Sequence, residues 1–342
     1  MTHMHYLYFF YLFNLLYICL NKNKYTMKNY AKLIKLTLLV VTSTLMFSCS
    51  DDDSTATGIR SIADVARSNS DFSILVSALE RAELIDVLDQ SGSYTVFAPT
   101  NAAFNNFLQE NDISSLNDIP VATLREVLLN HVVVGAKLSS SLNTGYVKTL
   151  GKGSASSTNT LSMYINTASG VRLNGVSSVV VADIGASNGV VHVVDAVIGL
   201  PTIVTHALAN PNFSTLVGAL TSPGQPNFVG ILSGTANSPF TVFAPSNDAF
   251  TNFENQNPGT LASLSTAQLT SVLTYHVVPG ANVLSNAIPS GPITTFEGGT
   301  FSISGVTITD EVSRQTNIVA VDVQAANGVI HVINNVILPE FN

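Results

Sequence analysis

The chain has 342 residues, enough for two or three domains of ordinary size, and its apolar fraction of 46% allows each domain a full core. Charged residues make up only 11% of the sequence, and the formal net charge is -8. Five of the 14 basic residues precede Cys49 and no acidic residue does, so the rest of the chain is strongly acidic; such a body repels phosphate backbones, which excludes nucleic acid as a partner.

The N-terminal segment indicates export. Residues 1–26 contain an apolar run that is too short for a comfortable membrane span of about 20 residues. From Met27 onward the pattern is that of a signal peptide, with a basic start, an apolar stretch over residues 36–47 and a small Ser48 before Cys49. We expect Met27 to be the true start and residues 1–48 to be a leader.

The same segment resembles a lipoprotein signal, in which Cys49 becomes the lipidated first residue. Leu45 and Phe47 depart from the usual pattern, and a plain secretory signal or a signal anchor is the alternative. Residues 50–53, Ser-Asp-Asp-Asp, resemble an acidic tag on surface-exposed lipoproteins of some diderm bacteria. The resemblance implies an exported chain held in the outer membrane by its lipid, with residues 49–57 as a polar tether.

The remainder of the chain is one unit repeated twice. TVFAPTNAAF (residues 95–104) returns as TVFAPSNDAF (241–250), LLNHVV (128–133) as LTYHVV (273–278), and NGVVHVV (188–194) as NGVIHVI (327–333). A period of about 140 residues is a whole domain, far longer than a solenoid repeat of about 20–50. The sequence predicts domains over residues 58–201 and 202–342, with no cysteine in either and therefore no disulfide framework.

Local patterns predict an α+β unit. The first helix expected in the unit carries its apolar face at i, i+3, i+4 and i+7 from Phe72. A strand over residues 94–97 leads into a helix capped by Thr100 or Asn101, and a later helix in the second unit begins with a Ser265–Gln268 capping box. These later helices present the apolar faces Leu124, Val127, Leu128, His131 and Leu269, Val272, Leu273, His276.

The C-terminal part of each unit predicts strands, expected in the first unit over residues 161–165, 177–182 and 190–194. The run 179–181, three consecutive valines, is apolar on both faces, as a buried strand requires. Residues 151–153 are expected in a hairpin loop, and Pro223, Gly224 and Pro226 in a surface loop inserted in the second unit.

The three repeated segments, in this order and twice over, resemble the landmark segments of the fasciclin (FAS1) family across residues 58–342. The resemblance implies two tandem FAS1 domains, each a wedge or sandwich of β-strands with packed α-helices. It also implies a role in adhesion or matrix contact. Separately, we predict no cofactor.

The family's binding motifs carry over only where residues match. A Tyr-His motif is intact as Tyr275-His276, whereas the first unit has Asn130 beside His131. An Asp-Ile pair before the last strand is present as Asp183-Ile184 and becomes Asp322-Val323 in the second unit. The resemblance implies Asp183, Ile184, Tyr275, His276, Asp322 and Val323 as candidate adhesion contacts.

The four repeated histidines also have a structural interpretation, which we favour. His131 and His276 follow apolar helical faces, and His192 and His331 alternate with apolar residues on strands, so each is expected in the core with backbone partners. A zinc site needs three or four ligands, and the nearest acidic candidate, Asp195, aligns with Asn334. We therefore predict no metal site.

One segment matches a hydrolase motif. Residues 185–189 read Gly-Ala-Ser-Asn-Gly, but the nucleophile elbow requires a helix after Ser187, and a strand is expected there. We therefore predict a non-catalytic surface lipoprotein that binds a surface protein or a polysaccharide through its two domains and the membrane through its lipid. A ligand- or glycan-binding accessory protein with an apolar pocket is the second hypothesis, and a hydrolase using Ser187 the third.

Overall fold

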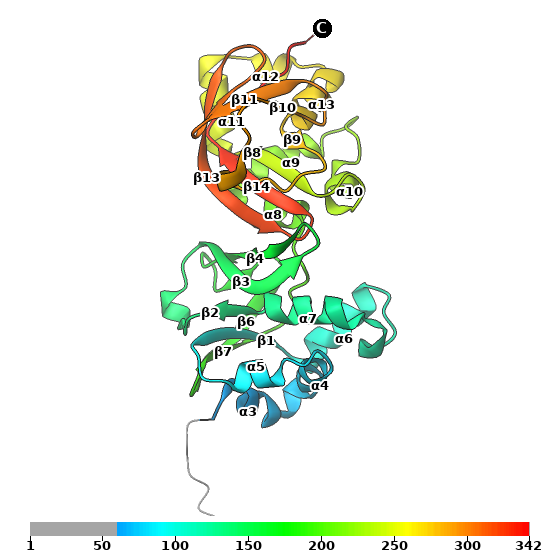
Figure 1. Ribbon diagram of the computed structural model, residues 1–342, viewed down its shortest axis with the longest axis vertical. Coiled ribbons are helices and arrows are strands. Elements are labelled where there is room, and N and C mark those ends of the chain that lie inside the picture. The colour runs from blue at the N-terminus through cyan, green and yellow to red at the C-terminus, as the bar shows by residue number, and fades with distance from the viewer. Residues whose placement is uncertain (1–59, 342) are drawn as a thin grey trace, which may run out of the picture. The chain divides into compact units, whose positions relative to one another are not determined.

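The computed structural model describes residues 60–341, and residues 59–342 group into one compact unit (Figure 1). The predicted leader, the lipidation site Cys49 and the polar tether lie outside the described residues.

The first repeated unit begins with helices and continues with strands, as the sequence predicts. Its helices are α3 (Ile62–Arg67), α4 (Ser73–Arg81), α5 (Ile85–Asp89), α6 (Asn101–Glu110) and α7 (Val121–Asn130), with short 3-10 turns η1 (Ser70–Phe72), η2 (Leu116–Asp118) and η3 (Ser139–Ser141). Its strands are β1 (Tyr94–Pro99), β2 (Val132–Val134), β3 (Gly145–Gly153), β4 (Ser156–Asn166), β5 (Arg172–Leu173), β6 (Ser177–Ala186) and β7 (Gly189–Val194).

These strands close into a barrel in the order β1 to β7. All neighbours are antiparallel except β1 and β7, which run parallel with Thr95 opposite Val190. The first landmark segment therefore lies beside the third in the sheet, although about 90 residues separate them in the sequence.

The second unit repeats the arrangement. Its helices are α8 (Ile203–Ala209), α9 (Ser214–Leu220), α10 (Phe228–Ser233), α11 (Asn247–Gln256), α12 (Thr260–Ser263) and α13 (Thr266–Tyr275), with η4 (Pro211–Phe213) and η5 (Ser285–Ala287). Its strands are β8 (Phe240–Pro245), β9 (Val277–Val278), β10 (Pro292–Thr294), β11 (Thr300–Ser304), β12 (Thr307–Thr309), β13 (Gln315–Ala325) and β14 (Gly328–Ile333).

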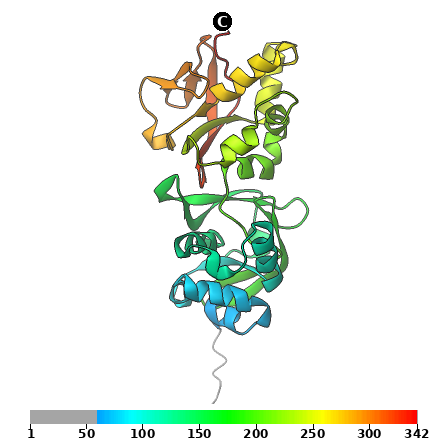
Figure 2. The same ribbon diagram turned by 90° about the vertical axis from the view of Figure 1, so that its right-hand side faces the viewer.

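The second sheet has seven strands in the order β10-β11-β12-β13-β14-β8-β9 and stays open between β9 and β10. Here too the pair β14 and β8 is parallel. Figure 2 shows the helices of this unit gathered on one side of its sheet. The predicted α+β class, a β wedge with packed helices, is confirmed for both units.

Local signals place the helix starts correctly. The Thr100 side chain accepts a hydrogen bond from the Ala103 amide at the start of α6. Ser265 and Gln268 form the predicted capping box of α13, each side chain bonding the other residue's amide. Residues 221–227 form the predicted surface loop between α9 and α10.

Two predictions about the strands are wrong. Residues 151–153 continue strand β3 and do not form the expected hairpin loop, which lies at residues 154–155. Val180 and Val181 are 56% and 51% exposed, not buried. The register of β6 on β7 shifts between Val181 and Ile184, so this part of β6 turns its valines to solvent. In the second unit, Val319 and Val321 of β13 are likewise 59% and 45% exposed beside a shift between Ala320 and Val323.

Candidate functional site

The Asn-Gly segment of each unit fastens the first helix to the sheet. The Asn188 side chain accepts the Ile62 amide at 2.9 Å and donates to the Leu88 and Gln90 carbonyl oxygens. The second unit repeats this set, with Asn327 accepting the Ile203 amide at 3.0 Å. Gly189 and Gly328 follow because a Cβ there would overlap the carbonyl oxygen of Tyr94 or Phe240 on the parallel strand.

The histidines that end α7 and α13 are buried and fully hydrogen-bonded. Nδ1 of His276 donates to the Val272 carbonyl at 2.7 Å, and Nε2 accepts the Ile337 amide. His131 makes the equivalent bonds to Val127 and Ile198. Burial lowers the pKa of each imidazole to about 4, so both are neutral near pH 7 and hold the chain after the last strand against the helix.

Tyr275 is completely buried beside His276. Its hydroxyl donates to the Thr300 carbonyl at 2.7 Å and accepts the Glu311 amide at 3.1 Å, and burial raises the pKa of the phenol. Asn130, at the same place in the first unit, instead donates to the Gly199 carbonyl and accepts the Thr149 hydroxyl. Both residues connect the helix to nearby backbone or strand groups.

The strand histidines are also core residues. Nε2 of His192 donates to the Lys137 carbonyl, and Nε2 of His331 to the Val283 carbonyl, both at 2.9 Å. Each ring stacks on a phenylalanine of the first landmark segment, Phe97 or Phe243, at centroid distances of 5.5 and 5.4 Å. These contacts agree with the core interpretation of the histidines.

The two candidate aspartates lie at the register shifts of β6 and β13, each with a left-handed backbone (φ 65° and 61°). The Asp183 carboxylate accepts the Ser139 amide at 2.7 Å and the Ser139 hydroxyl at 2.6 Å, and these bonds lower the pKa of the carboxyl. Asp322 holds Ser285 in the same way, at 2.8 and 2.6 Å. Each aspartate thus fixes a bulge in its strand to a 3-10 turn.

The candidate adhesion contacts therefore differ in accessibility. The side chains of Tyr275, His276 and Val323 are buried, so a partner at the surface does not reach them directly. Asp183 is exposed, Ile184 and Asp322 are half-buried, and all three lie beside exposed valines. That these residues contact a partner stays a prediction.

The exposed valines are the surface feature that the sequence interpretation missed. We call Val180, Val181, Val319 and Val321 the valine face, since each pair precedes the equivalent aspartate of its unit. Of these, only Val180 and Val319 occupy equivalent positions in the two domains. Neighbouring exposed apolar groups can mark an interaction surface. The run of valines before Asp-Ile did not predict this exposure, because the bulge that turns the valines to solvent is not visible in the sequence.

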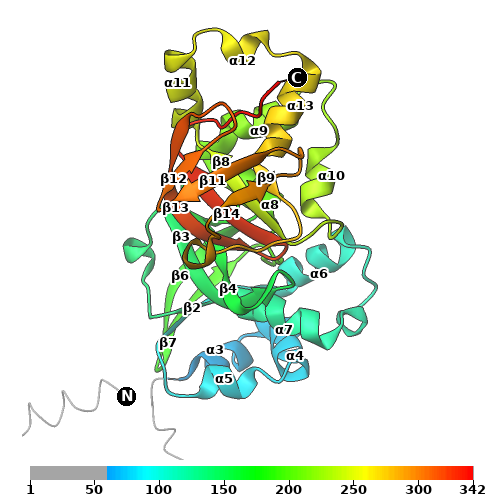
Figure 3. The same ribbon diagram turned by 45° about the horizontal axis from the view of Figure 1, so that its top comes forward.

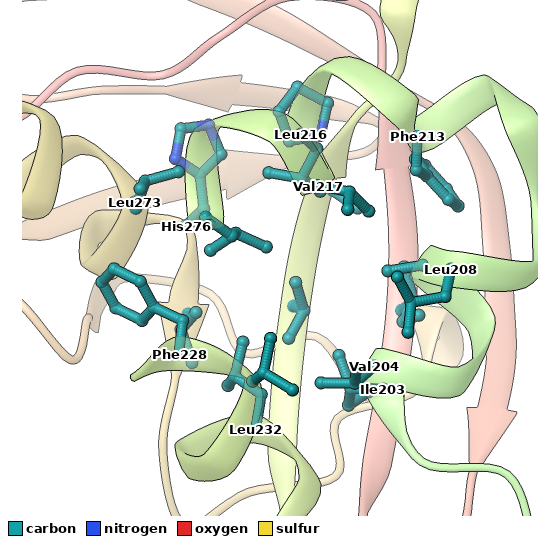
Figure 4. A pocket seen from close by; sticks show the side chains of 18 of the residues that line it. Ile203, Val204, Leu208, Phe213, Leu216, Val217, Phe228, Leu232, Leu273 and His276 are labelled. Carbon is teal, nitrogen blue, oxygen red and sulfur yellow. The ribbon is translucent and has the colours of Figure 1, made fainter. Parts of the chain in front are cut away.

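An apolar pocket lies among the helices of the second unit (Figure 4). It encloses about 650 Å³ of space, part of it open to solvent, between α8, α9, α10, α13 and β8. Leu208 and Val229 at its edge are 63% and 41% exposed. His276 is its one lining imidazole, and both ring nitrogens already have backbone partners, so the pocket suits an apolar group.

The first unit has the equivalent pocket in a smaller form, about 410 Å³. Phe72, Leu75 and His131 line it where Phe213, Leu216 and His276 line the other. Seven residues, 221–227, separate α9 from α10, against three, 82–84, between α4 and α5. The insertion accompanies the larger pocket.

The candidate hydrolase motif lies in a hairpin turn. Ser187 is exposed in the tight turn between the antiparallel strands β6 and β7, and no helix follows it. Among residues 60–341, no three His, Cys, Asp or Glu side chains gather in a way that could hold a metal ion. Within the same part of the chain, none of the helices has the length and apolar character needed to cross a bilayer.

The two repeated units each match a known protein family. A model of the Fasciclin domain matches residues 70–201 and again residues 211–339. The solved FAS1 domain pair from the insect cell adhesion molecule fasciclin I matches with a TM-score of 0.50 and 20% identity, covering 80% of this chain and 98% of that one.

Sequence relatives come from several kingdoms. Protein sll1483 of Synechocystis is 42% identical over 144 residues, 40% of this chain and 73% of that protein. Immunogenic protein MPB70 of Mycobacterium bovis is 32% identical over 130 residues, 38% of this chain and 65% of its own length. Human periostin is 27% identical over 269 residues, 76% of this chain but only 30% of periostin.

Proposed function

Because this chain belongs to the fasciclin domain family, we propose that it is an exported, lipid-anchored binding protein that attaches its cell to a surface protein or a polysaccharide, without catalytic activity. Cys49 carries the lipid in this proposal, and the two domains present the binding surface. The description of fasciclin I as a cell adhesion molecule supports the adhesion part by analogy.

One observation carries the proposal: both domains expose a pair of valines next to an aspartate that holds a strand bulge in place. Burying four valines against a partner is favourable at about 25 cal/mol per Å² of apolar surface. The rigid bulges reduce the entropy lost on binding. Two such pairs on one chain raise the effective concentration of the second contact once the first has formed.

The proposed absence of catalysis is supported by three histidines and by Ser187. The ring nitrogens of His131, His192 and His276 are bonded to backbone groups, and Ser187 lies in a hairpin turn. An esterase activity that disappears in Ser187→Ala would refute this part.

The test is retention of beads that carry the chain on co-resident cells and on extracted surface polysaccharide. Replacing Val180 and Val181, or Val319 and Val321, by serine should weaken retention, and replacing all four should weaken it most. The control replaces Val121 of α7 and Val134 of β2 by serine. These valines are 47% and 62% exposed and do not belong to the valine face. Equal retention of the four-serine variant and the control variant would refute the proposed role of the valine face.

The anchor has its own test. Labelling with a fatty-acid analogue should mark the wild-type chain and leave Cys49→Ala unlabelled, and surface proteolysis should then report exposure of the body. Label on both chains, or on neither, would refute lipidation at Cys49.

The pocket of the second domain favours a second candidate function, that of a ligand-binding accessory protein. Leu208, at the mouth of this pocket, aligns with Arg67 of the first domain. Leu208→Arg therefore introduces the side chain that the first domain has at the equivalent position. In a thermal-shift screen of small apolar ligands, this candidate predicts stabilisation of the wild type that Leu208→Arg reduces. Stabilisation by no ligand, or equally in both chains, would reject it.

A further inference from the structure

A second concave site lies inside the compact unit, between the two FAS1 domains. Strand β4 of the first domain lies beside β13 of the second (Figures 1 and 3). The cleft there spans about 600 Å³ of space, part of which is open solvent. Its walls include Tyr146, Tyr164, Asn210, Asn212, Ser246 and Ala320.

Hydrogen bonds across the domain boundary hold the walls in place. The Gln324 amide donates to the Ser162 hydroxyl at 3.0 Å, and the Ala155 amide to the Ala326 carbonyl at 2.8 Å. The Lys148 ammonium donates to the Asp322 carbonyl at 2.9 Å. The cleft is therefore formed before any ligand arrives, which lowers the entropic cost of binding.

Tyr146 fixes the floor of the cleft. Its hydroxyl accepts a hydrogen bond from the Asn210 side chain of the other domain at 3.3 Å, and its ring meets the edge of His206 at a centroid distance of 5.5 Å. The Tyr164 ring lies 5.0 Å from it. Burial raises the pKa of Tyr146 to about 12, so the phenol stays a neutral donor and acceptor.

The lining carries no Asp, Glu, Lys, Arg or His side chain. It offers phenol, amide and hydroxyl groups next to apolar surface from Phe213, Ala320 and Val332. Asn212 is exposed. The Tyr164 side chain is only 4% exposed, but it lines the cleft and its hydroxyl forms no hydrogen bond within residues 60–341, so both residues can bond a ligand inside the cleft. An ionic ligand would find no counter-charge here, and a purely apolar ligand would leave the polar groups unpaired.

We propose that this cleft binds a neutral oligosaccharide segment of a surface polysaccharide. A sugar ring has hydroxyl groups that both donate and accept, which match phenol and amide groups, and C–H faces that pack on aromatic and apolar side chains. The inference rests on the proposed binding function and adds a site and a ligand class to it.

The test is calorimetric titration of the whole chain, purified in a detergent without a sugar headgroup. The ligands are maltotetraose, cellotetraose, laminaritetraose and mannotetraose, with tetragalacturonate as the charged comparison. Ala320→Trp fills the cleft, and Tyr164→Phe removes one hydroxyl. The control is Val121→Trp, on α7 of the first domain, where the side chain is 47% exposed and lies outside both the cleft lining and the valine face.

At least one neutral tetrasaccharide should bind the wild type. Its affinity should be about tenfold lower for Ala320→Trp, several-fold lower for Tyr164→Phe, and unchanged for Val121→Trp. If Ala320→Trp lowers the urea midpoint, Asn212→Ala replaces it, with the same direction expected. Binding to no neutral sugar, binding to tetragalacturonate alone, or equal loss in Val121→Trp would overturn the inference. Bead retention separates the two proposals: retained wild-type beads with no sugar binding reject the cleft alone, and wild-type beads that are not retained reject the proposed function.

Discussion

Replacing Asn327 by alanine should strongly destabilise the second domain. The side chain is 4% exposed, accepts the Ile203 amide, and donates to the Leu232 and Gly234 carbonyl oxygens at 2.7 and 3.3 Å. Ile203 and Leu232 are themselves buried, so the variant leaves a buried donor and a buried acceptor without partners. Each such group costs about 1–3 kcal/mol, which gives an expected loss of about 4 kcal/mol in the free energy of unfolding.

Urea unfolding followed by circular dichroism measures this loss. With a slope of about 2 kcal/mol per M, the midpoint of the affected transition should fall by about 2 M. Asn188→Ala should do the same to the first domain, because Asn188 makes the same three bonds. Asn106→Ala is the control, exposed on α6, and should change stability by less than about 0.5 kcal/mol. A loss below about 1 kcal/mol in Asn327→Ala would refute the assignment of this motif to the fold.

Three further outcomes are expected. Gly328→Ala should cost about 2–4 kcal/mol because its Cβ meets the Phe240 carbonyl, whereas Gly185→Ala, with open space around it, should be tolerated; equal urea midpoints would contradict this. Lowering the pH from 7 to 4.5 should lower the free energy of unfolding by on the order of 2–3 kcal/mol through His276, because the unfolded imidazole takes up a proton near pH 6.5 and the buried one only near pH 4. His276→Gln should lose this part of the pH dependence of stability. An unchanged pH profile in that variant would exclude this role of His276. Asp322→Ala should release η5, so the Ser285 amide should exchange its hydrogen faster while the amides of β14 keep their protection; unchanged exchange at Ser285 would show that the carboxylate does not hold the turn.

The parts of the fold that depend on local signals follow from the sequence. The Ser265–Gln268 box and the Thr100 cap are short-range hydrogen bonds, and they are present as predicted. The duplication places the same elements in both units because identical motifs fold under the same constraints. The core role of the histidines also follows, since their apolar spacing is visible in the sequence.

The surfaces are harder to predict, because they depend on long-range packing. The exposure of Val180 and Val181 follows from a bulge at Asp183, whose left-handed backbone is stabilised by a serine 44 residues earlier. The cleft brings Tyr146 beside Asn210, 64 residues away, and no motif marks either residue. The pocket of the second domain depends on how far an inserted loop separates two helices.

The central claim is that the motifs repeated in both domains stabilise the fold, whereas the solvent-exposed valine face binds the partner. The most direct measurement compares bead retention and urea stability in Asn188→Ala and in the four-serine valine variant. The account predicts lower stability with retained binding, under conditions where the chain is folded, for Asn188→Ala, and normal stability with lost binding for the valine variant. Normal binding by the valine variant, or lost binding by a fully folded Asn188→Ala chain, would contradict it.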